Sequence, residues 1–181
     1  MAQVKILDPA QAPGKSKELL DALQKNIKSV PNLAKALANS PAALKAWMEF
    51  DGALAKGSLN AKLRQEIALA VGQKNGCEYC VSAHTTIGKL AGLTDQQILK
   101  SRLGQGISPK DTAALTFTRE LLEKHGQVPT SSIQALRAHG FTDGEIVEII
   151  AHVALNIYTN YFNIALDVDV DFPRVALHQL A

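Results

Sequence analysis

The chain has 181 residues, enough for one globular domain with a buried core. Its 19 Lys and Arg residues against 17 Asp and Glu residues give a net charge of +2, which argues against a nucleic-acid-binding protein that works by neutralising phosphates. Hydrophobic residues make up 46% of the chain, which excludes a disordered protein, and 2 cysteines are too few for a disulfide-stapled secreted scaffold.

Helix-start and helix-stop signals recur along the chain, and no segment alternates apolar and polar residues as a strand would. Ser40 and Ser108 each precede a proline suited to a first helical turn. Thr94 and Thr142 are each followed three residues later by Gln or Glu, the spacing of a capping box. The sequence therefore predicts an all-α fold, with a short turn at 33–39 and helices near 15–29, 41–56, 61–75, 77–91, 95–102, 109–125, 131–139 and 143–166.

Two irregular arms flank these predicted helices, at 1–14 and at 168–181, and no low-complexity linker divides the chain between them. We therefore expect residues 1–181 to form one helical domain with two arms. The N-terminus lacks the apolar segment of a secretory signal, and the most hydrophobic stretch, 146–166, carries several polar side chains. A cytoplasmic protein without a membrane-spanning segment is the resulting prediction.

The segment with the clearest chemistry is Cys77-x-x-Cys80-x-x-x-His84. On a helix that advances about 100° per residue, these three side chains share one face, whereas Tyr79 points away from it. Cys80 and His84 form an i, i+4 pair, so the imidazole can take the proton of the thiol. Two thiols one turn apart can also close a disulfide.

The spacing leaves open which thiol is the more reactive. Gly76 ends the preceding predicted helix, so Cys77 lies in the first turn of the next one, where unpaired N–H groups and the helix dipole favour a thiolate. The neighbouring imidazole of His84 instead favours Cys80.

Glu66 lies on the preceding predicted helix, in a stretch whose next residues are apolar. A carboxylate there is expected to face a partner, and a histidine is the natural candidate. The alternative is an exposed residue that pairs with Lys62 or Arg64 on the surface.

Several roles other than redox chemistry are compatible with two cysteines at this spacing. Haem attachment requires His directly after the second Cys, where Val81 stands, and a thioredoxin-like domain requires strands. Zinc requires four ligands; His84 lies nearby, and His125, His139 and His152 are more distant candidates. Zinc binding and a pair of inert, buried thiols both stay open as alternatives.

A polar stripe marks the late helix, formed by His152, Asn156, Asn160 and Asn163 among apolar neighbours. Buried amides need hydrogen-bond partners. The stripe therefore lines a substrate cavity, faces a subunit interface, or bonds to the ends of neighbouring helices.

The residues from Glu66 through Cys77-x-x-Cys80-x-x-x-His84 to the following Gly-Leu-Thr resemble the core of the alkylhydroperoxidase D (AhpD) and carboxymuconolactone decarboxylase superfamily, over about 61–100. The flanking helices are similar to those of its peroxidase-related members. The resemblance implies an AhpD-like helical bundle. It also implies that Cys80 attacks a hydroperoxide, that Cys77 resolves the product as a disulfide, and that His84 and Glu66 relay protons.

The same resemblance implies an antioxidant enzyme without metal or cofactor, which uses an alkyl hydroperoxide and a dithiol electron donor and assembles as a homo-oligomer, commonly a trimer or hexamer. Tyr79 departs from the family's alkylhydroperoxidase, which has a relay histidine there, and a phenol with a pKa of about 10 does not replace that base. Two alternatives are a dithiol redox partner or sensor with little turnover, and a carboxymuconolactone decarboxylase-like enzyme. Decarboxylase members generally lack the cysteine pair.

Overall fold

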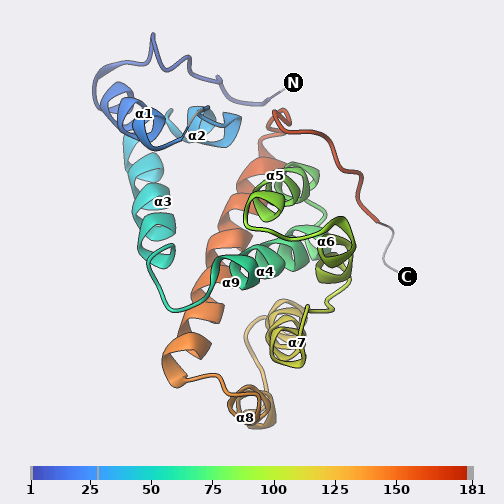
Figure 1. The fold of residues 1–181 in the computed structure, drawn as a ribbon. Helices are drawn as coiled ribbons and strands as arrows, with labels where there is room; N and C mark the ends of the chain where they lie inside the picture. Colours follow the sequence, from blue (N-terminus) through green and yellow to red (C-terminus); the bar gives the residue numbers. More distant parts are fainter. Residues whose placement is uncertain (1, 28, 179–181) are drawn as a thin grey trace.

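The computed structural model of the chain describes residues 2–27 and 29–178. Its regular secondary structure there is entirely α-helical, which confirms the predicted all-α fold (Figure 1). The described helices are α1 (Gly14–Asn26), α2 (Asn32–Leu37), α3 (Pro41–Leu54), α4 (Ala61–Lys74), α5 (Glu78–Leu90), α6 (Asp95–Arg102), α7 (Pro109–Glu123), α8 (Thr130–Ala138) and α9 (Asp143–Ala165). None of these helices is long and apolar enough to cross a membrane.

The helices begin at the predicted cap residues. The hydroxyl oxygens of Ser40 and Ser108 accept hydrogen bonds from backbone N–H groups three residues later, at 3.3 Å and 3.1 Å. Thr94 and Thr142 form complete capping boxes with Gln and Glu side chains that bond back to the cap N–H groups. These local contacts satisfy donors that the first helical turn leaves without partners.

The first helix ends three residues earlier than predicted, a larger difference than at the other helix ends. The helix expected at 15–29 ends at Asn26, because Ile27 adopts an extended conformation with φ −133° and ψ 146°. Pro31 then serves as the N-cap of α2. A proline also disfavours helical backbone at the residue before it, so Val30 stays outside α2.

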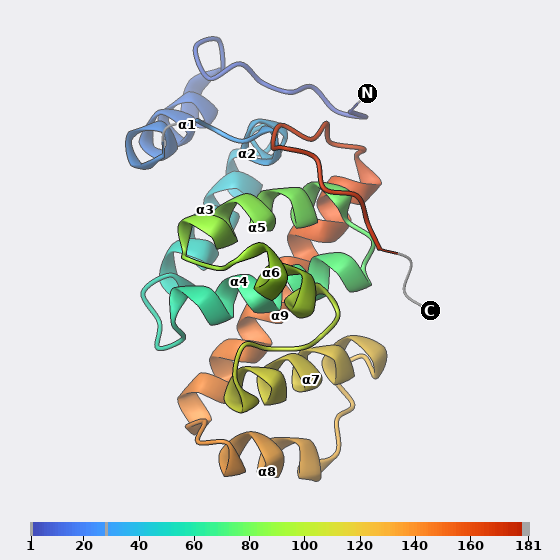
Figure 2. The ribbon, with the colours of Figure 1, turned by 45° about the vertical axis from the view of Figure 1, so that its right-hand side comes forward.

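Two hydrophobic clusters make up most of the core, and α9 connects them. The first joins α1, α2, α3 and the start of α5, with Leu20 and Leu44 at its centre. The second packs α4, α7, α8 and α9 around Ile67, Phe117 and Ile149. Helix α9 runs from α8 past α4 to α5, and it also contacts α3 and α7 (Figures 1 and 2). It therefore lies beside α3, α4 and α5, three of the elements that build the site described below.

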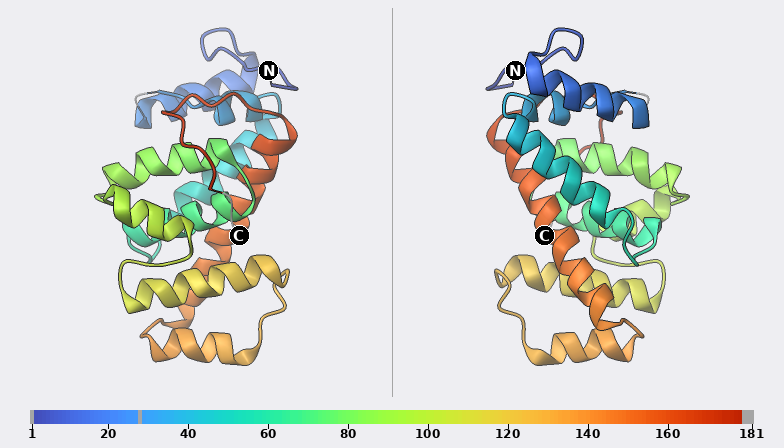
Figure 3. Two further views of the ribbon diagram at one scale, coloured as in Figure 1. Left: turned by 90° about the vertical axis from the view of Figure 1, so that its right-hand side faces the viewer. Right: turned by 90° about the vertical axis from the view of Figure 1, so that its left-hand side faces the viewer.

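The two predicted arms, where the structure describes them (2–13 and 168–178), are irregular and pack on the chain itself (Figure 3). The N–H of Gln3 donates to the carbonyl oxygen of Leu166 at 2.7 Å, which ties the first arm to the end of α9. The second arm crosses α5, where the N–H of Val175 donates to Oγ of Ser82 at 3.0 Å. The same arm places Asp171 in a hydrogen bond with the Tyr79 hydroxyl and the ring of Phe172 against the ring of Tyr79.

Candidate redox site

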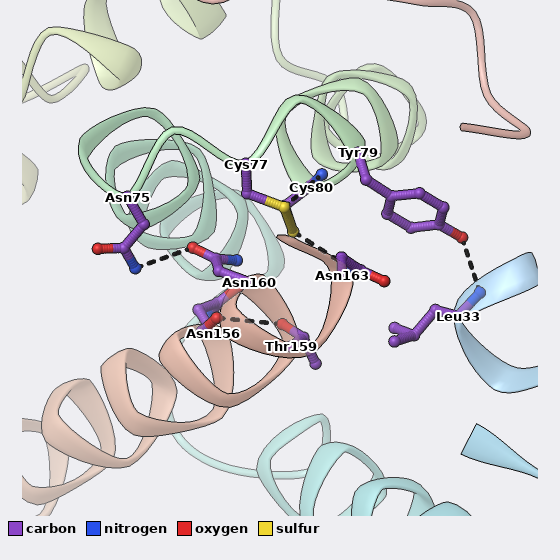
Figure 4. Close-up of a disulfide and its surroundings, with 9 residues drawn as sticks. All are labelled: Leu33, Asn75, Cys77, Tyr79, Cys80, Asn156, Thr159, Asn160 and Asn163. Atoms are coloured by element: carbon purple, nitrogen blue, oxygen red, sulfur yellow. Dashed lines mark hydrogen bonds between the residues drawn. A yellow bond between two sulfur atoms is a disulfide. The ribbon is translucent and has the colours of Figure 1, made fainter. Parts of the chain in front are cut away.

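Cys77 and Cys80 form a disulfide where α4 leads into α5 (Figure 4). Gly76 has φ +71°, in the left-handed region that favours glycine, and it turns the chain sharply after α4. Cys77 is then the N-cap of α5 rather than part of its first turn, and its sulfur accepts a hydrogen bond from the Cys80 N–H at 3.2 Å. The two Cα atoms lie 5.3 Å apart, a distance at which a disulfide forms without backbone movement.

Cys80 opens onto a cavity of about 440 Å³. Its walls come from the ends of α1 and α2, from α3, α4, α5 and α9, and from the C-terminal arm. Half of the lining residues are apolar: Leu23, Ile27, Pro31, Leu33, Trp47, Ala55, Ala68, Ala83, Ile87, Leu155 and Phe172. The polar lining consists of Ser29, Asp51, Arg64, Gln65, Tyr79, Cys80, His84, His152, Asn156, Thr159 and Asn163. Cys77 does not line it, so the two sulfur atoms differ in their access to a bound molecule.

Asn163 is the hydrogen-bond partner of the Cys80 sulfur. Its amide nitrogen donates to Sγ across 3.4 Å, and both side chains are buried (Figure 4). A hydrogen bond to the charged form of a group favours that form, so this amide favours a Cys80 thiolate once the disulfide is reduced. The polar stripe on the late helix includes Asn163, but nothing in the sequence indicated that its side chain contacts a sulfur atom.

The rest of the stripe divides between two of the roles considered for it. His152 and Asn156 line the cavity together with Asn163. Asn160 instead accepts a hydrogen bond from Nδ2 of Asn75, the C-cap residue of α4, at 3.1 Å. The stripe thus forms one wall of the cavity and also bonds to the end of a neighbouring helix.

His84 lines the same cavity and is held by Gln65. Its Nδ1 donates to Oε1 of Gln65 at 2.8 Å, which leaves Nε2 as the proton-accepting atom because an amide oxygen only accepts. Burial lowers the pKa of His84 to about 4. The imidazole is therefore neutral at pH 7 and has the form of a base.

The sequence predicted that Glu66 faces a histidine, but its side chain faces α6 and the loop after it. Its Oε1 accepts hydrogen bonds from the N–H of Ile107 at 3.1 Å and from Oγ of Ser101 at 3.3 Å, on the side of α6 and the loop that follows it. Consecutive helical residues point about 100° apart, so when Gln65 faces His84, Glu66 faces elsewhere. The prediction that a histidine is its partner is corrected: the side chain behind His84 is Gln65.

The Glu66→Gln variant is expected to change the pH dependence of stability and to leave redox turnover of the cysteine pair intact. Burial, reinforced by Asp111, raises the pKa of Glu66 to about 7. An acid whose pKa is raised on folding stabilises the fold below its ordinary pKa, and this contribution is lost as pH rises through the folded value. From pH 4.5 to 8, wild-type stability should therefore fall relative to the variant by up to about 3 kcal/mol, measured by urea unfolding. A large loss of turnover in the variant would return Glu66 to the proton relay.

Tyr79 points away from the disulfide, toward α2, although its ring borders the cavity (Figure 4). Its hydroxyl donates to Oδ1 of Asp171 at 2.9 Å and accepts from the N–H of Leu33 at 3.1 Å. Burial raises the pKa of the phenol, and Asp171 raises it further. Tyr79 therefore stays protonated and ties the C-terminal arm to α2.

The described residues offer no ligand set for the zinc alternative. Within 2–27 and 29–178, no three His, Cys, Asp or Glu side chains come together in a way that could hold a metal ion. His125 follows α7 and His139 caps the end of α8, both in a part of the fold that does not border the cavity.

The chain is similar to known proteins both in sequence and in fold. Residues 41–124 match the model of the carboxymuconolactone decarboxylase family. The uncharacterized protein YdfG of Bacillus subtilis (strain 168) is 26% identical over 115 residues, which cover 61% of this chain and 78% of YdfG.

Two solved structures show the same architecture over nearly the whole chain. The AhpD core of an uncharacterized peroxidase-related protein from Ralstonia eutropha JMP134 has a TM-score of 0.84 at 25% identity, covering 94% of this chain and 92% of that one. A variant of the debrominase Bmp8, in complex with 2,3,4-tribromopyrrole, has a TM-score of 0.79 at 18% identity, covering 94% and 92%. The second likeness concerns the fold alone.

Proposed function

We propose that the chain, which matches the carboxymuconolactone decarboxylase family over residues 41–124 and has a fold similar to that of an AhpD core, is a cysteine-based peroxidase that reduces alkyl hydroperoxides through a Cys77–Cys80 dithiol–disulfide cycle. The observation that carries this proposal is the position of Cys80. Its sulfur faces the cavity, is bonded to the Cys77 sulfur and accepts a hydrogen bond from Asn163. A sulfur that attacks a bound substrate needs this access, and a resolving thiol does not.

The cycle begins with the reduced pair. The Cys80 thiolate attacks one peroxide oxygen, the O–O bond breaks, Cys80 becomes a sulfenic acid, and the leaving alkoxide takes a proton to depart as an alcohol. His84 accepts the thiol proton at Nε2 and returns it to the leaving oxygen. The Cys77 thiol then attacks the sulfenic sulfur, which releases water and forms the disulfide. Thiol–disulfide exchange with a dithiol donor restores both thiols.

The electron donor in this proposal is an external dithiol, because the described cavity holds one redox pair. Each turnover consumes both electrons that the pair can supply. A reducing compartment such as the cytoplasm keeps a donor of this kind available, and we place the protein there.

A stoichiometric reaction tests the proposal directly. Reduced protein, freed of reductant, is mixed with cumene hydroperoxide, and free thiols and cumyl alcohol are counted. We expect loss of both thiols and one alcohol per chain, followed by repeated turnover when dithiothreitol is added. Disulfide formation with negligible peroxide turnover would identify the alternative, a dithiol redox partner or sensor. An activity that survives alkylation of both cysteines would point to the decarboxylase-like alternative.

We also propose that the protein is a homo-oligomer, a trimer or hexamer, assembled through the outer side of α9. Val147, Ile150, Tyr158, Tyr161 and Ile164 are exposed along this helix, at spacings that place them on one side of it. A contiguous row of exposed apolar side chains is typical of a protein–protein contact. The cavity lies against the opposite side of α9, so assembly leaves its lining in place.

Tyr161→Glu is expected to dissociate the assembly, because it puts a charge in the middle of the apolar row. The molar mass is measured by light scattering during gel filtration. Leu90→Glu is the matched control, since Leu90 is 84% exposed but lies on α5. A monomeric wild type, or a Tyr161→Glu protein with wild-type mass, would contradict the proposed interface.

A further inference from the structure

The cavity contains a second recognition point, far from the sulfur. We propose that the substrate is an elongated, amphipathic organic hydroperoxide whose distal end carries an acceptor oxygen, in a carboxylate or a carbonyl group, that Arg64 and His152 bind. This inference rests on the proposed peroxidase function and adds the class of substrate to it.

The two ends of the cavity are marked by residues of α9. Asn163 bonds to the Cys80 sulfur at one end, and His152, which also lines the cavity, comes eleven residues earlier. At a rise of 1.5 Å per residue, these positions are about 16 Å apart along the helix axis. A molecule that presents its peroxide to Cys80 therefore reaches His152 only if it is elongated.

His152 provides an unpartnered polar atom at the distal end. The side chain is 6% exposed, and its Nε2 is buried without a hydrogen-bond partner in the described structure. Burial lowers the pKa of His152 to about 4, with Arg64 acting in the same direction and Glu148 opposing, so the ring is neutral at pH 7. A buried polar group without a partner is destabilising, and an acceptor oxygen on a ligand would satisfy the N–H of this ring.

Arg64 provides a positive charge at the same end. Its Nη1 donates to the carbonyl oxygens of Leu54 and Ala55 at the end of α3, which orients the guanidinium. Among the ion pairs of the described residues none involves Arg64. Asp51 also lines the cavity; burial raises the pKa of its carboxyl group, and the charge of Arg64 opposes that rise. Guanidinium groups favour carboxylate and carbonyl oxygens as acceptors.

The walls between the two ends are largely apolar, with Trp47, Leu155 and Phe172 among them. The volume of about 440 Å³ falls within the range of small-molecule sites. Hydrogen peroxide would leave these walls and the distal donors without contact. The chemistry of the lining thus fits an apolar body with one polar group at each end.

Binding to the oxidised protein tests the inference without turnover. Trp47 is the single tryptophan of the chain and lines the cavity, so its fluorescence reports occupancy. The probes are octanoic acid and methyl octanoate. Wild type is expected to bind both, and Arg64→Leu to weaken octanoate about tenfold or more, because a charge-assisted hydrogen bond is lost. His152→Leu should weaken both probes.

Two variants separate recognition from folding. Arg64→Lys keeps the positive charge and should retain part of the octanoate affinity, while Lys62→Leu removes an exposed charge from the same helix, outside the cavity, and should change nothing. Loss for octanoate alone in Arg64→Leu identifies a carboxylate as the preferred head group. Loss for both probes identifies a carbonyl.

Absence of binding to the wild type, or equal affinities in wild type, Arg64→Leu and His152→Leu, would overturn the inference. The proposed function can fail independently of this inference. If binding depends on Arg64 but no hydroperoxide yields an alcohol, the second recognition point stands and the peroxidase proposal is wrong. If both hold, Arg64→Leu should lower kcat/KM for a hydroperoxide that bears a carboxylate by a larger factor than for tert-butyl hydroperoxide, which carries no distal acceptor oxygen.

Discussion

Cys80→Ser is expected to lower hydroperoxide turnover by at least about a thousandfold, because the serine hydroxyl is not ionised near neutral pH and forms no sulfenic acid. The wild-type sulfur lies in the cavity wall and accepts a hydrogen bond from Asn163, so an attacking thiolate would form where the substrate binds. Serine is close to cysteine in size, so the loss would be chemical rather than structural. Alcohol formation from cumene hydroperoxide, with dithiothreitol as donor, measures it.

Cys77→Ser is the matched control for this prediction. Its Cys80 should still react once with hydroperoxide, and the resulting sulfenic acid should be trapped by dimedone. Repeated turnover should fall because no resolving thiol is present. The opposite pattern, with dimedone labelling of Cys77 in the Cys80→Ser protein, would reverse the roles. That result would mean that the helix N-terminus activates Cys77 more strongly than the surroundings of Cys80 activate its thiol.

His84→Phe is expected to lower kcat/KM about a hundredfold at pH 7, the usual size of a general-base contribution. The wild-type imidazole is neutral there, because burial holds the pKa of His84 at about 4. The defect should shrink above about pH 9, where an ordinary thiol ionises without a base. A defect of the same size at every pH would indicate that the ring shapes the cavity instead of moving a proton.

Substitutions of Gln65 test the proton relay through the pH dependence of the rate. A carboxylate in Gln65→Glu would raise the pKa of His84, since a nearby negative charge favours the imidazolium. The base is active only when neutral, so the acidic limb of the pH–rate profile should move to higher pH in this variant. Gln65→Leu removes the acceptor of Nδ1–H and should lower the rate without such a shift. An unchanged profile in Gln65→Glu would separate Gln65 from the relay.

The features predicted well from the sequence depend on residues close together in the chain. Ser40 and Thr142 cap their helices through contacts three residues away, and such contacts follow from local sequence. The spacing of Cys77 and Cys80, three residues apart, similarly indicated that the two thiols can pair.

The features that were missed depend on how helices pack. Gln65 and Glu66 are neighbours on α4, and only the rotation of that helix against α5 decides which of them meets His84. The apolar residues that follow Glu66 favoured the carboxylate, because a charged group in such a stretch is expected to face a partner. The contact of Asn163 with Cys80 joins residues 83 positions apart, and no periodicity within one helix reveals it.

Both thiols lie in one stretch of the chain, and part of the cavity wall beside Cys80 comes from other stretches. The family match spans 41–124, which includes both cysteines and His84. Asn163, His152 and Phe172 lie beyond it, on α9 and on the C-terminal arm. Helix α9 and the arm thus complete the cavity from outside the segment that carries the thiols. Exchanging them with those of a relative should therefore change the preferred hydroperoxide, provided that the amide that bonds to the Cys80 sulfur is kept.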